Sequence, residues 1–155
     1  MINCYNTKKI TSSNQGNLKI GGLIGDSYDS TVENCYNSGE LEIDFCSKKD
    51  GKVGGIVGHG SSDTIRNSYN LKAITVKNLV DGNYIGAIAG TGGGSTFERN
   101  YYLEGTATSG VGNEVADAEG ILEAKSRADI LNLMNTNLPS DVWEQGKNGE
   151  YPGLK

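Results

Sequence analysis

The sequence is poor in several residue types that mark common protein classes. Its 155 residues include two prolines, one tryptophan and one histidine. A lone histidine, His59, does not make a zinc site of the usual kind, and we expect it at a surface corner. No cluster of Lys or Arg accompanies the net charge of −5, and no apolar run approaches the roughly 18 residues of a membrane-spanning helix. We therefore expect neither a nucleic-acid partner nor membrane insertion.

Glycine is in excess, and its positions repeat. The chain has 23 glycines, about twice the average share of about 7%. The stretch Gly21-Gly22-Leu23-Ile24-Gly25 has near-copies at 54–58 and 86–90. The glycines kept at fixed offsets predict a close backbone approach or a positive φ. The middle position reads Gly22, Gly55 and then Ala87, so we expect it to need small size and to tolerate Ala.

A second marker keeps the same period. An Asn-Cys/Ser-Tyr segment recurs, and the fourth copy carries one extra residue between Phe97 and Asn100. In this alignment the repeated asparagines are Asn34, Asn67 and Asn100. The repeated tyrosines are Tyr5, Tyr36, Tyr69 and Tyr102, separated by 31, 33 and 33 residues. Two markers with one period indicate a structural repeat.

The apolar pattern within each unit is typical of strands. Leu41, Ile43 and Phe45 alternate with Glu42 and Asp44, which is a period of two. Tandem three-strand units predict an all-β, right-handed parallel β-solenoid of three to four coils, with about 32 residues per coil. We expect two buried ladders, one of Ile10, Leu41 and Ile74, the other containing Val32 and Ile65.

These residues resemble a known family. The G-L-x-G core and the N-C-Y-N-x-G strand are similar to the GLUG repeat of bacterial surface proteins, over about residues 1–110. Such repeats occur in adhesin-like proteins and in the non-catalytic N-terminal regions of IgA-specific metallo-endopeptidases. The resemblance implies a β-helix on the cell surface, outside the cell, without catalytic residues. The sequence differs from the family pattern at Ala87, at the extra residue near Arg99 and in the last coil, where only Val111-Gly112 remains of the glycine motif.

The character of the chain changes near residue 114. We divide it into solenoid coils at 1–113 and a C-terminal cap at 114–155. Ser126 begins a capping box, which predicts a short helix over about 127–135. A tail with Trp143, a Gly-rich turn and Tyr151-Pro152 follows. A last coil needs such a cover. No such covering segment precedes the first coil, so we expect further coils of a parent chain before Met1.

The repeated tyrosines are the candidate ligand site. If Cys35 points inward and Tyr36 outward, stacked tyrosines would form a strip that suits a host glycan, a cell-wall glycan or a surface protein. The alternative is that the tyrosines point inward and fill the coil, because the sequence does not fix the phase at a corner.

The other candidates for chemistry have simpler structural interpretations. Asp26, Asp29 and Asp63 offer a weak calcium possibility beside a role as solvated turn residues. The run Gly90–Ser95 predicts a corner, because a strand rather than a helix follows it. The cysteines fit no C-x-x-C spacing, and Cys4 and Cys35 share one repeat position, where a disulfide would be strained. Cys46 is the odd thiol.

The sequence therefore favours a non-catalytic structural or adhesion module, a stalk or a ligand-presenting β-helix, without a cofactor. A carbohydrate-binding module using the tyrosines is the first alternative. A fragment of a glycan-active enzyme is the second, although the acidic residues scatter over different corners.

Overall fold

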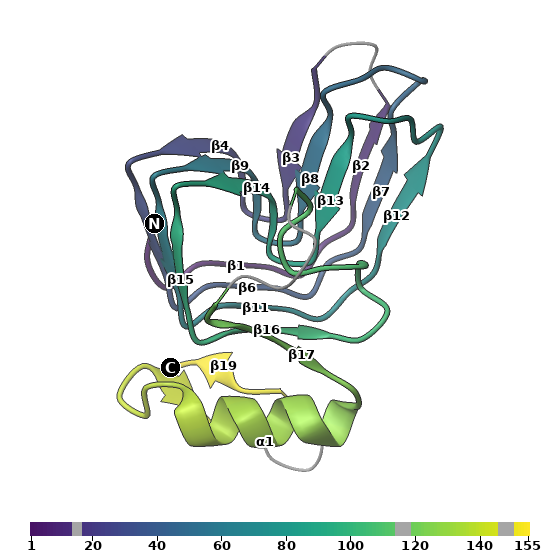
Figure 1. Ribbon diagram of the computed structural model, residues 1–155. Helices are drawn as coiled ribbons and strands as arrows, with labels where there is room; N and C mark the ends of the chain where they lie inside the picture. Colours follow the sequence, from purple (N-terminus) through teal and green to yellow (C-terminus); the bar gives the residue numbers. More distant parts are fainter. Residues whose placement is uncertain (14–16, 114–118, 146–150) are drawn as a thin grey trace.

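The computed structural model describes residues 1–13, 17–113, 119–145 and 151–155. The strands of the coils form parallel sheets, in which each strand pairs with its equivalent one repeat away. Viewed along the axis, three coils lie one behind another, and α1 lies beneath them (Figure 1). The fold is the predicted all-β parallel solenoid with a C-terminal helical cap.

Five sheets run along the solenoid. The largest consists of β1 (Tyr5–Asn6), β6 (Tyr36–Asn37), β11 (Tyr69–Asn70), β16 (Asn100–Leu103) and β17 (Ile121–Ala124). The second consists of β2 (Ile10–Ser13), β7 (Leu41–Asp44) and β12 (Ile74–Lys77). The third consists of β3 (Lys19–Gly21), β8 (Lys52–Gly54) and β13 (Tyr84–Gly86). The fourth consists of β4 (Ile24–Tyr28), β9 (Val57–Ser61) and β14 (Ala89–Gly93). The fifth consists of β5 (Thr31–Glu33), β10 (Thr64–Arg66) and β15 (Thr96–Glu98).

The register of both predicted apolar ladders is confirmed, whereas Ile10 and Ile74 are only partly buried. Leu41 pairs in parallel register with Ile10 on one side and with Ile74 on the other. Val32 and Ile65 pair in the same way, and both are fully buried. The two ladders lie in separate apolar clusters, one between the second and third sheets and one enclosed by the remaining walls. Each coil therefore encloses two small cores rather than one.

The register corrects the alignment of the fourth repeat. Ile65 pairs with Phe97 and Tyr69 pairs with Tyr101, so no residue is inserted between them. Arg99 takes the position of Asn34 and Asn67, and all three have a positive φ of 51–55°. The sequence alignment placed Asn100 at this position because it matched asparagine with asparagine, although the arginine adopts the left-handed conformation here. Asn100 instead occupies the next position.

The repeated glycines owe their place to close contacts. None of Gly21, Gly25, Gly54 and Gly58 is among the residues with positive φ. A Cβ at Gly54 would lie 1.9 Å from the carbonyl oxygen of Val57, and at Gly25 it would lie 2.6 Å from that of Lys19. Such distances leave no room for a side chain, so the close-approach alternative is confirmed.

The expectation that the middle position tolerates Ala is wrong for Gly55. A Cβ there would lie 2.1 Å from the carbonyl oxygen of Ala87 and 2.4 Å from Nδ2 of Asn70. In the third coil the residue at the asparagine position is Tyr102, and Ala87 packs in the same cluster as this side chain. The alanine therefore marks the end of the regular stack.

The C-terminal cap packs on the outer face of the largest sheet, beside the coils (Figure 1), and not over the end of the stack as predicted. Helix α1 (Arg127–Asn137) begins after Ser126, whose Oγ accepts a hydrogen bond from the Asp129 amide. It ends two residues later than predicted, before Pro139. Strands β18 (Trp143–Glu144) and β19 (Gly153–Leu154) then pair antiparallel. The predicted Gly-rich turn at 146–150 lies outside the described residues, and the predicted boundary at 113/114 lies at the edge of a stretch, 114–118, that is also outside them.

Candidate functional site

The tyrosines form a stacked ladder, with one change of membership. The ring centroids of Tyr5, Tyr36 and Tyr69 lie 5.0 Å apart at each step, and the planes differ by 5° and 7°. Tyr101, not Tyr102, stands opposite Tyr69 in the register. Tyr102 is buried in the solenoid core instead, so its assignment to the ladder is wrong.

The tyrosines of the ladder point away from the solenoid core, and the cap covers Tyr36 and Tyr69 but not Tyr5. Cys35 lies in the core, whereas Tyr36 packs against the cluster that contains α1. The Trp143 ring lies 5.4 Å from that of Tyr69, whose hydroxyl donates a hydrogen bond to the Pro152 carbonyl oxygen. Tyr69 is 1% exposed and Tyr5 is 58% exposed. The ladder is therefore a docking surface for the chain's own C-terminus rather than an open strip.

Burial also changes the acidity of these phenols. The pKa of Tyr69 is raised far above its usual value of 10, mainly because burial disfavours the phenolate. Burial raises the pKa of Tyr36 and of Tyr101 in the same direction. The phenols under the cap therefore stay neutral and pack as aromatic side chains.

An asparagine ladder that the sequence analysis missed crosses the interior. Nδ2 of Asn6 donates to Oδ1 of Asn37 at 3.0 Å, and Nδ2 of Asn37 donates to Oδ1 of Asn70 at 3.0 Å. Asn37 also exchanges hydrogen bonds with the backbone of Gly39. The signal was the Tyr-Asn dipeptide in the first three repeats, which we had used only as a marker of period.

The other asparagine position makes contacts between coils as well. Asn34 Nδ2 donates to Oδ1 of Asn3 at 3.1 Å, and Arg99 Nε donates to Oδ1 of Asn67 at 2.8 Å. Asn100, one position further along, accepts from the Ser68 amide. These side chains hold neighbouring coils together and bear on the fold rather than on chemistry.

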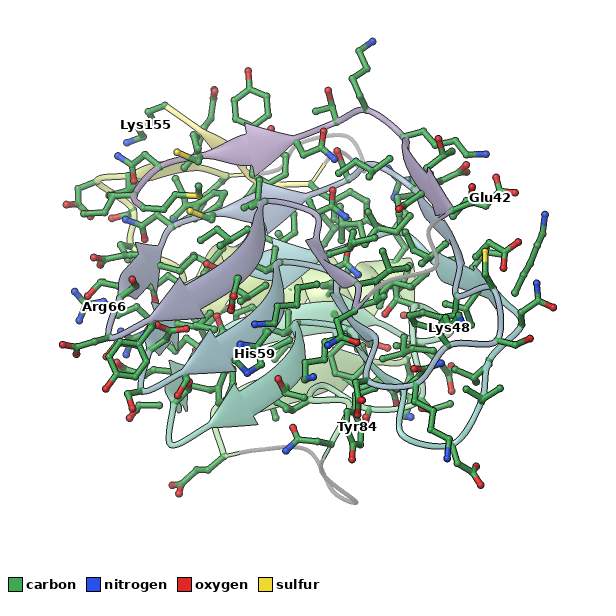
Figure 2. All side chains as sticks on the ribbon, turned by 90° about the horizontal axis from the view of Figure 1, so that it is seen from above. Glu42, Lys48, His59, Arg66, Tyr84 and Lys155 are labelled. Atoms are coloured by element: carbon green, nitrogen blue, oxygen red, sulfur yellow. The ribbon has the colours of Figure 1, made fainter. Side chains whose placement is uncertain are left out.

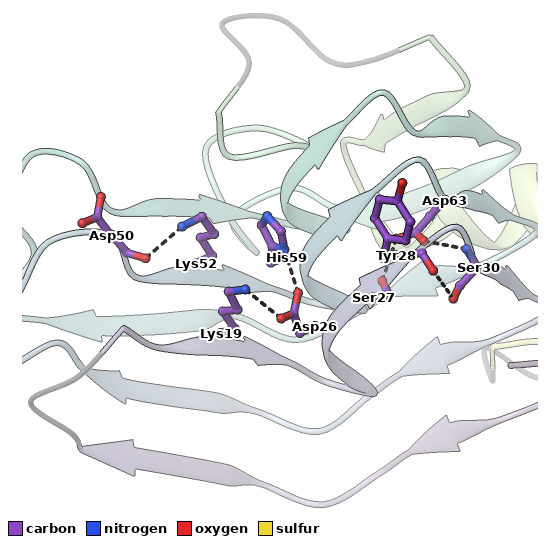
Figure 3. A network of polar contacts seen from close by, with 9 residues as sticks. All are labelled: Lys19, Asp26, Ser27, Tyr28, Ser30, Asp50, Lys52, His59 and Asp63. Carbon is purple, nitrogen blue, oxygen red and sulfur yellow. Dashed lines mark hydrogen bonds and ion pairs between the residues drawn. The ribbon is translucent and has the colours of Figure 1, made fainter.

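The aspartates of the calcium hypothesis are not brought together. Asp63 is 2% exposed, and its two oxygens accept from the Ser27 hydroxyl at 2.6 Å and the Ser30 amide at 2.9 Å (Figure 3). Asp26 lies on another face and pairs with Lys19, whereas Asp29 has a positive φ of 47° at a turn. Within the described residues no three of His, Cys, Asp and Glu gather around a common point.

The cysteines and the glycine run have structural surroundings. Cys4 and Cys35 stand at equivalent positions as free thiols, and each lies near the carbonyl oxygen two residues earlier. Burial raises the pKa of the Cys35 thiol, which keeps it protonated. Cys46 is also free. Gly90–Gly93 lie in β14, and Gly94, with a φ of 69°, turns the predicted corner into β15.

The glycine motif builds a re-entrant corner between the third and fourth sheets (Figure 1). Outward side chains diverge at a convex corner, but here Lys19 Nζ on β3 lies 2.7 Å from Asp26 Oδ2 on β4. The two strands approach this closely because Gly25 lies against the Lys19 carbonyl and Gly58 against the Ile20 amide, where a Cβ would be 2.6 and 2.5 Å away.

Each coil adds one residue to each wall of this corner. Lys19, Lys52 and Tyr84 are aligned on one wall. Asp26, His59 and Thr91 are aligned on the other wall. We call these six residues the corner residues. Asp26 joins the two walls through Lys19, and its Oδ1 lies 2.7 Å from Nδ1 of His59 on its own wall (Figure 3). His59 and Tyr84 both lie toward the viewer in Figure 2.

The electrostatics of the corner follow from these contacts. The hydrogen bond from Lys19, followed by that with His59, lowers the pKa of Asp26 below its usual value. Lys52 Nζ donates to the backbone carbonyl of Asp50, whose carboxylate is directed away from it (Figure 3). Within the described residues Lys52 has no ion pair, so one wall of the corner carries two lysines and the facing wall one carboxylate, although the Lys52 ammonium is directed toward Asp50 (Figure 3).

The fold defines a parallel β-solenoid built from a short tandem repeat. The family model of the GLUG motif matches residues 16–43, which contain the first glycine stretch and the strands β3 to β7. The chain therefore contains a GLUG motif, which supports the predicted resemblance to GLUG-repeat proteins. Neither the curated proteins nor the solved structures include a match to it. No helix in the described residues is long and apolar enough to cross a membrane.

Proposed function

We propose that the chain is a non-catalytic structural module of an extracellular bacterial surface protein, a stiff solenoid that spaces or presents other parts of that protein. The observation that carries this proposal is the continuity of side-chain hydrogen bonds from Asn6 through Asn37 to Asn70. Backbone pairing in five parallel sheets runs in the same direction. A stack joined along its whole length resists bending and supports a role as a spacer.

The absence of enzyme activity is part of the proposal. Glycoside hydrolysis by the common route needs a carboxylic acid with a raised pKa opposite a carboxylate. The three described carboxyls with clearly shifted pKa values, Asp26, Glu42 and Asp44, are all shifted downward by nearby donors. This pattern supports binding and packing roles rather than proton transfer. The covered tyrosines give the carbohydrate-binding alternative no open aromatic strip.

Two measurements test the proposal. Antibodies against the folded domain should label intact cells of the source bacterium, and labelling only after permeabilisation would overturn the extracellular assignment. The purified domain should release no reducing ends from polysaccharides and no new amino termini from peptides. Pectate lyase and trypsin serve as positive controls. Turnover that co-purifies with the domain and is lost on its unfolding would contradict the non-catalytic role.

A further inference from the structure

We propose that the re-entrant corner is a binding site for a carboxylate-bearing sugar, a uronic-acid residue within a polysaccharide, held by Lys52, His59 and Tyr84. This site differs from the tyrosine ladder, and it goes beyond the role as a spacer. A domain that fails to bind would remain a structural module.

The first observation in favour of this site is that the Lys52 ammonium group has no carboxylate partner among the described residues. Lys19 is neutralised by Asp26 at 2.7 Å, whereas Lys52 contacts only a backbone carbonyl oxygen among the described residues. An ammonium group fixed at one position on a strand pairs well with a carboxylate, and a charge-assisted hydrogen bond is about twice as strong as a neutral one.

The residues next to Lys52 suit a ligand in which the carboxylate is part of a sugar. Tyr84 stands directly beside Lys52 in the register and is 37% exposed, so part of its ring is free to stack on a pyranose. His59 lies on the facing wall, one rung from Asp26, and its Nδ1 is engaged with that carboxylate. Its Nε2 remains to contact a sugar hydroxyl.

The geometry of the corner suits one or two sugar units. Successive rungs are about 4.8 Å apart, which is comparable with the length of one pyranose unit. At the third coil the corner is closed, because Thr91 is 7% exposed beside the bridge between Ala89 and Val111. The open part therefore spans the rungs of Lys19 and Lys52, and Tyr84 of the third coil borders it.

The overall charge limits the class of ligand. With a net charge of −5, the protein repels densely sulfated or phosphorylated polymers. A sugar with a single carboxylate requires one cationic group. Lys52 supplies that group, because Lys19 is already paired with Asp26. Affinity for an isolated site of this size would be low, and many copies on one surface would raise it.

The test compares tetragalacturonate with its fully methyl-esterified form, by titration calorimetry or by NMR shifts of the domain. We expect the acid to bind at least about tenfold more tightly than the ester. Lys52→Gln should abolish that preference, and Tyr84→Ala should weaken both ligands. Lys48→Gln is the matched control, because it removes an exposed lysine from the turn that precedes β8, outside the corner residues (Figure 2). Thermal unfolding of each variant checks that it folds.

Three outcomes would overturn the proposal. Equal affinity for the acid and the ester would exclude recognition of the carboxylate. Unchanged binding by Lys52→Gln would exclude the corner, and no binding of tetragalacturonate at all would exclude this ligand class. A tetraglutamate peptide is included as a further arm, and binding as tight as that of the sugar would assign the corner to acidic peptides instead.

Discussion

The buried asparagine ladder makes a sharp prediction about stability. Asn37 is fully buried, and its amide makes four hydrogen bonds, two with the backbone of Gly39 and one each with Asn6 and Asn70. Asn37→Ala would leave the N–H and C=O of Gly39 buried without a partner. Each such group costs about 1–3 kcal/mol, so the expected loss in the free energy of unfolding is about 2–6 kcal/mol.

Asn6→Ala is the matched control for Asn37→Ala. Asn6 occupies the same ladder position in the first coil, but it is only partly buried and water reaches the groups it leaves. The expected loss is therefore about 0.5–1.5 kcal/mol. Urea unfolding followed by far-UV circular dichroism gives both values from the midpoints, provided that the slopes agree. Equal losses for the two variants would refute the view that burial of the ladder, rather than its hydrogen bonds as such, sets the cost.

Three further predictions concern the glycine contacts, the left-handed position and the cap. Gly55→Ala should cost about 1–3 kcal/mol through overlap with the next coil, whereas Gly93→Ala, with open space around its Cβ, should change the urea midpoint little. Arg99→Asn should raise the free energy of unfolding by about 0.5–1 kcal/mol, because asparagine tolerates the φ of 52°; a loss would show that the arginine contacts matter more. The folded pKa of Tyr69 is raised, so its contribution to stability is complete below about pH 10 and is lost as the pH rises further. Absorbance at 295 nm should then show a late phase of tyrosine ionisation that coincides with unfolding, and the amplitude of that phase should be smaller in Tyr69→Phe, in which Tyr36 and Tyr101 still ionise late.

The solenoid could be predicted because a tandem repeat carries two independent signals, one for the strands and one for their pairing. The period of two identified the strands, and the period of about 32 residues fixed which strands pair. Ile10, Leu41 and Ile74 could be placed in one ladder without knowing the path of the chain between them. The helix start at Ser126 was equally predictable, since a capping box is a local signal.

The errors arose where a residue was matched by type rather than by backbone conformation. Asn100 was aligned with Asn67 because both are asparagines, although the left-handed position belongs to Arg99. The cover over Tyr69 was also beyond reach, because nothing in the pattern says which face the cap takes. The re-entrant corner depends on two strands whose backbones come into contact at glycines. A glycine pattern predicts this close contact, but it does not predict whether the corner is convex or re-entrant.

Within each coil, some positions contact the next coil and others face outward, and this difference explains why a ligand site is expected at the corner. Positions that touch the next coil allow few residues, so glycine and asparagine recur there and leave no freedom for a ligand. The corner residues point outward and bear no such constraint, and the three rungs carry different pairs: lysine with aspartate, lysine with histidine, and tyrosine with threonine. Apart from the buried Thr91, variation at these positions costs the stack little, because the side chains contact each other and solvent rather than the core. A repeat built in this way can change its ligand by substitution at the corner while its glycines and asparagines keep the same fold.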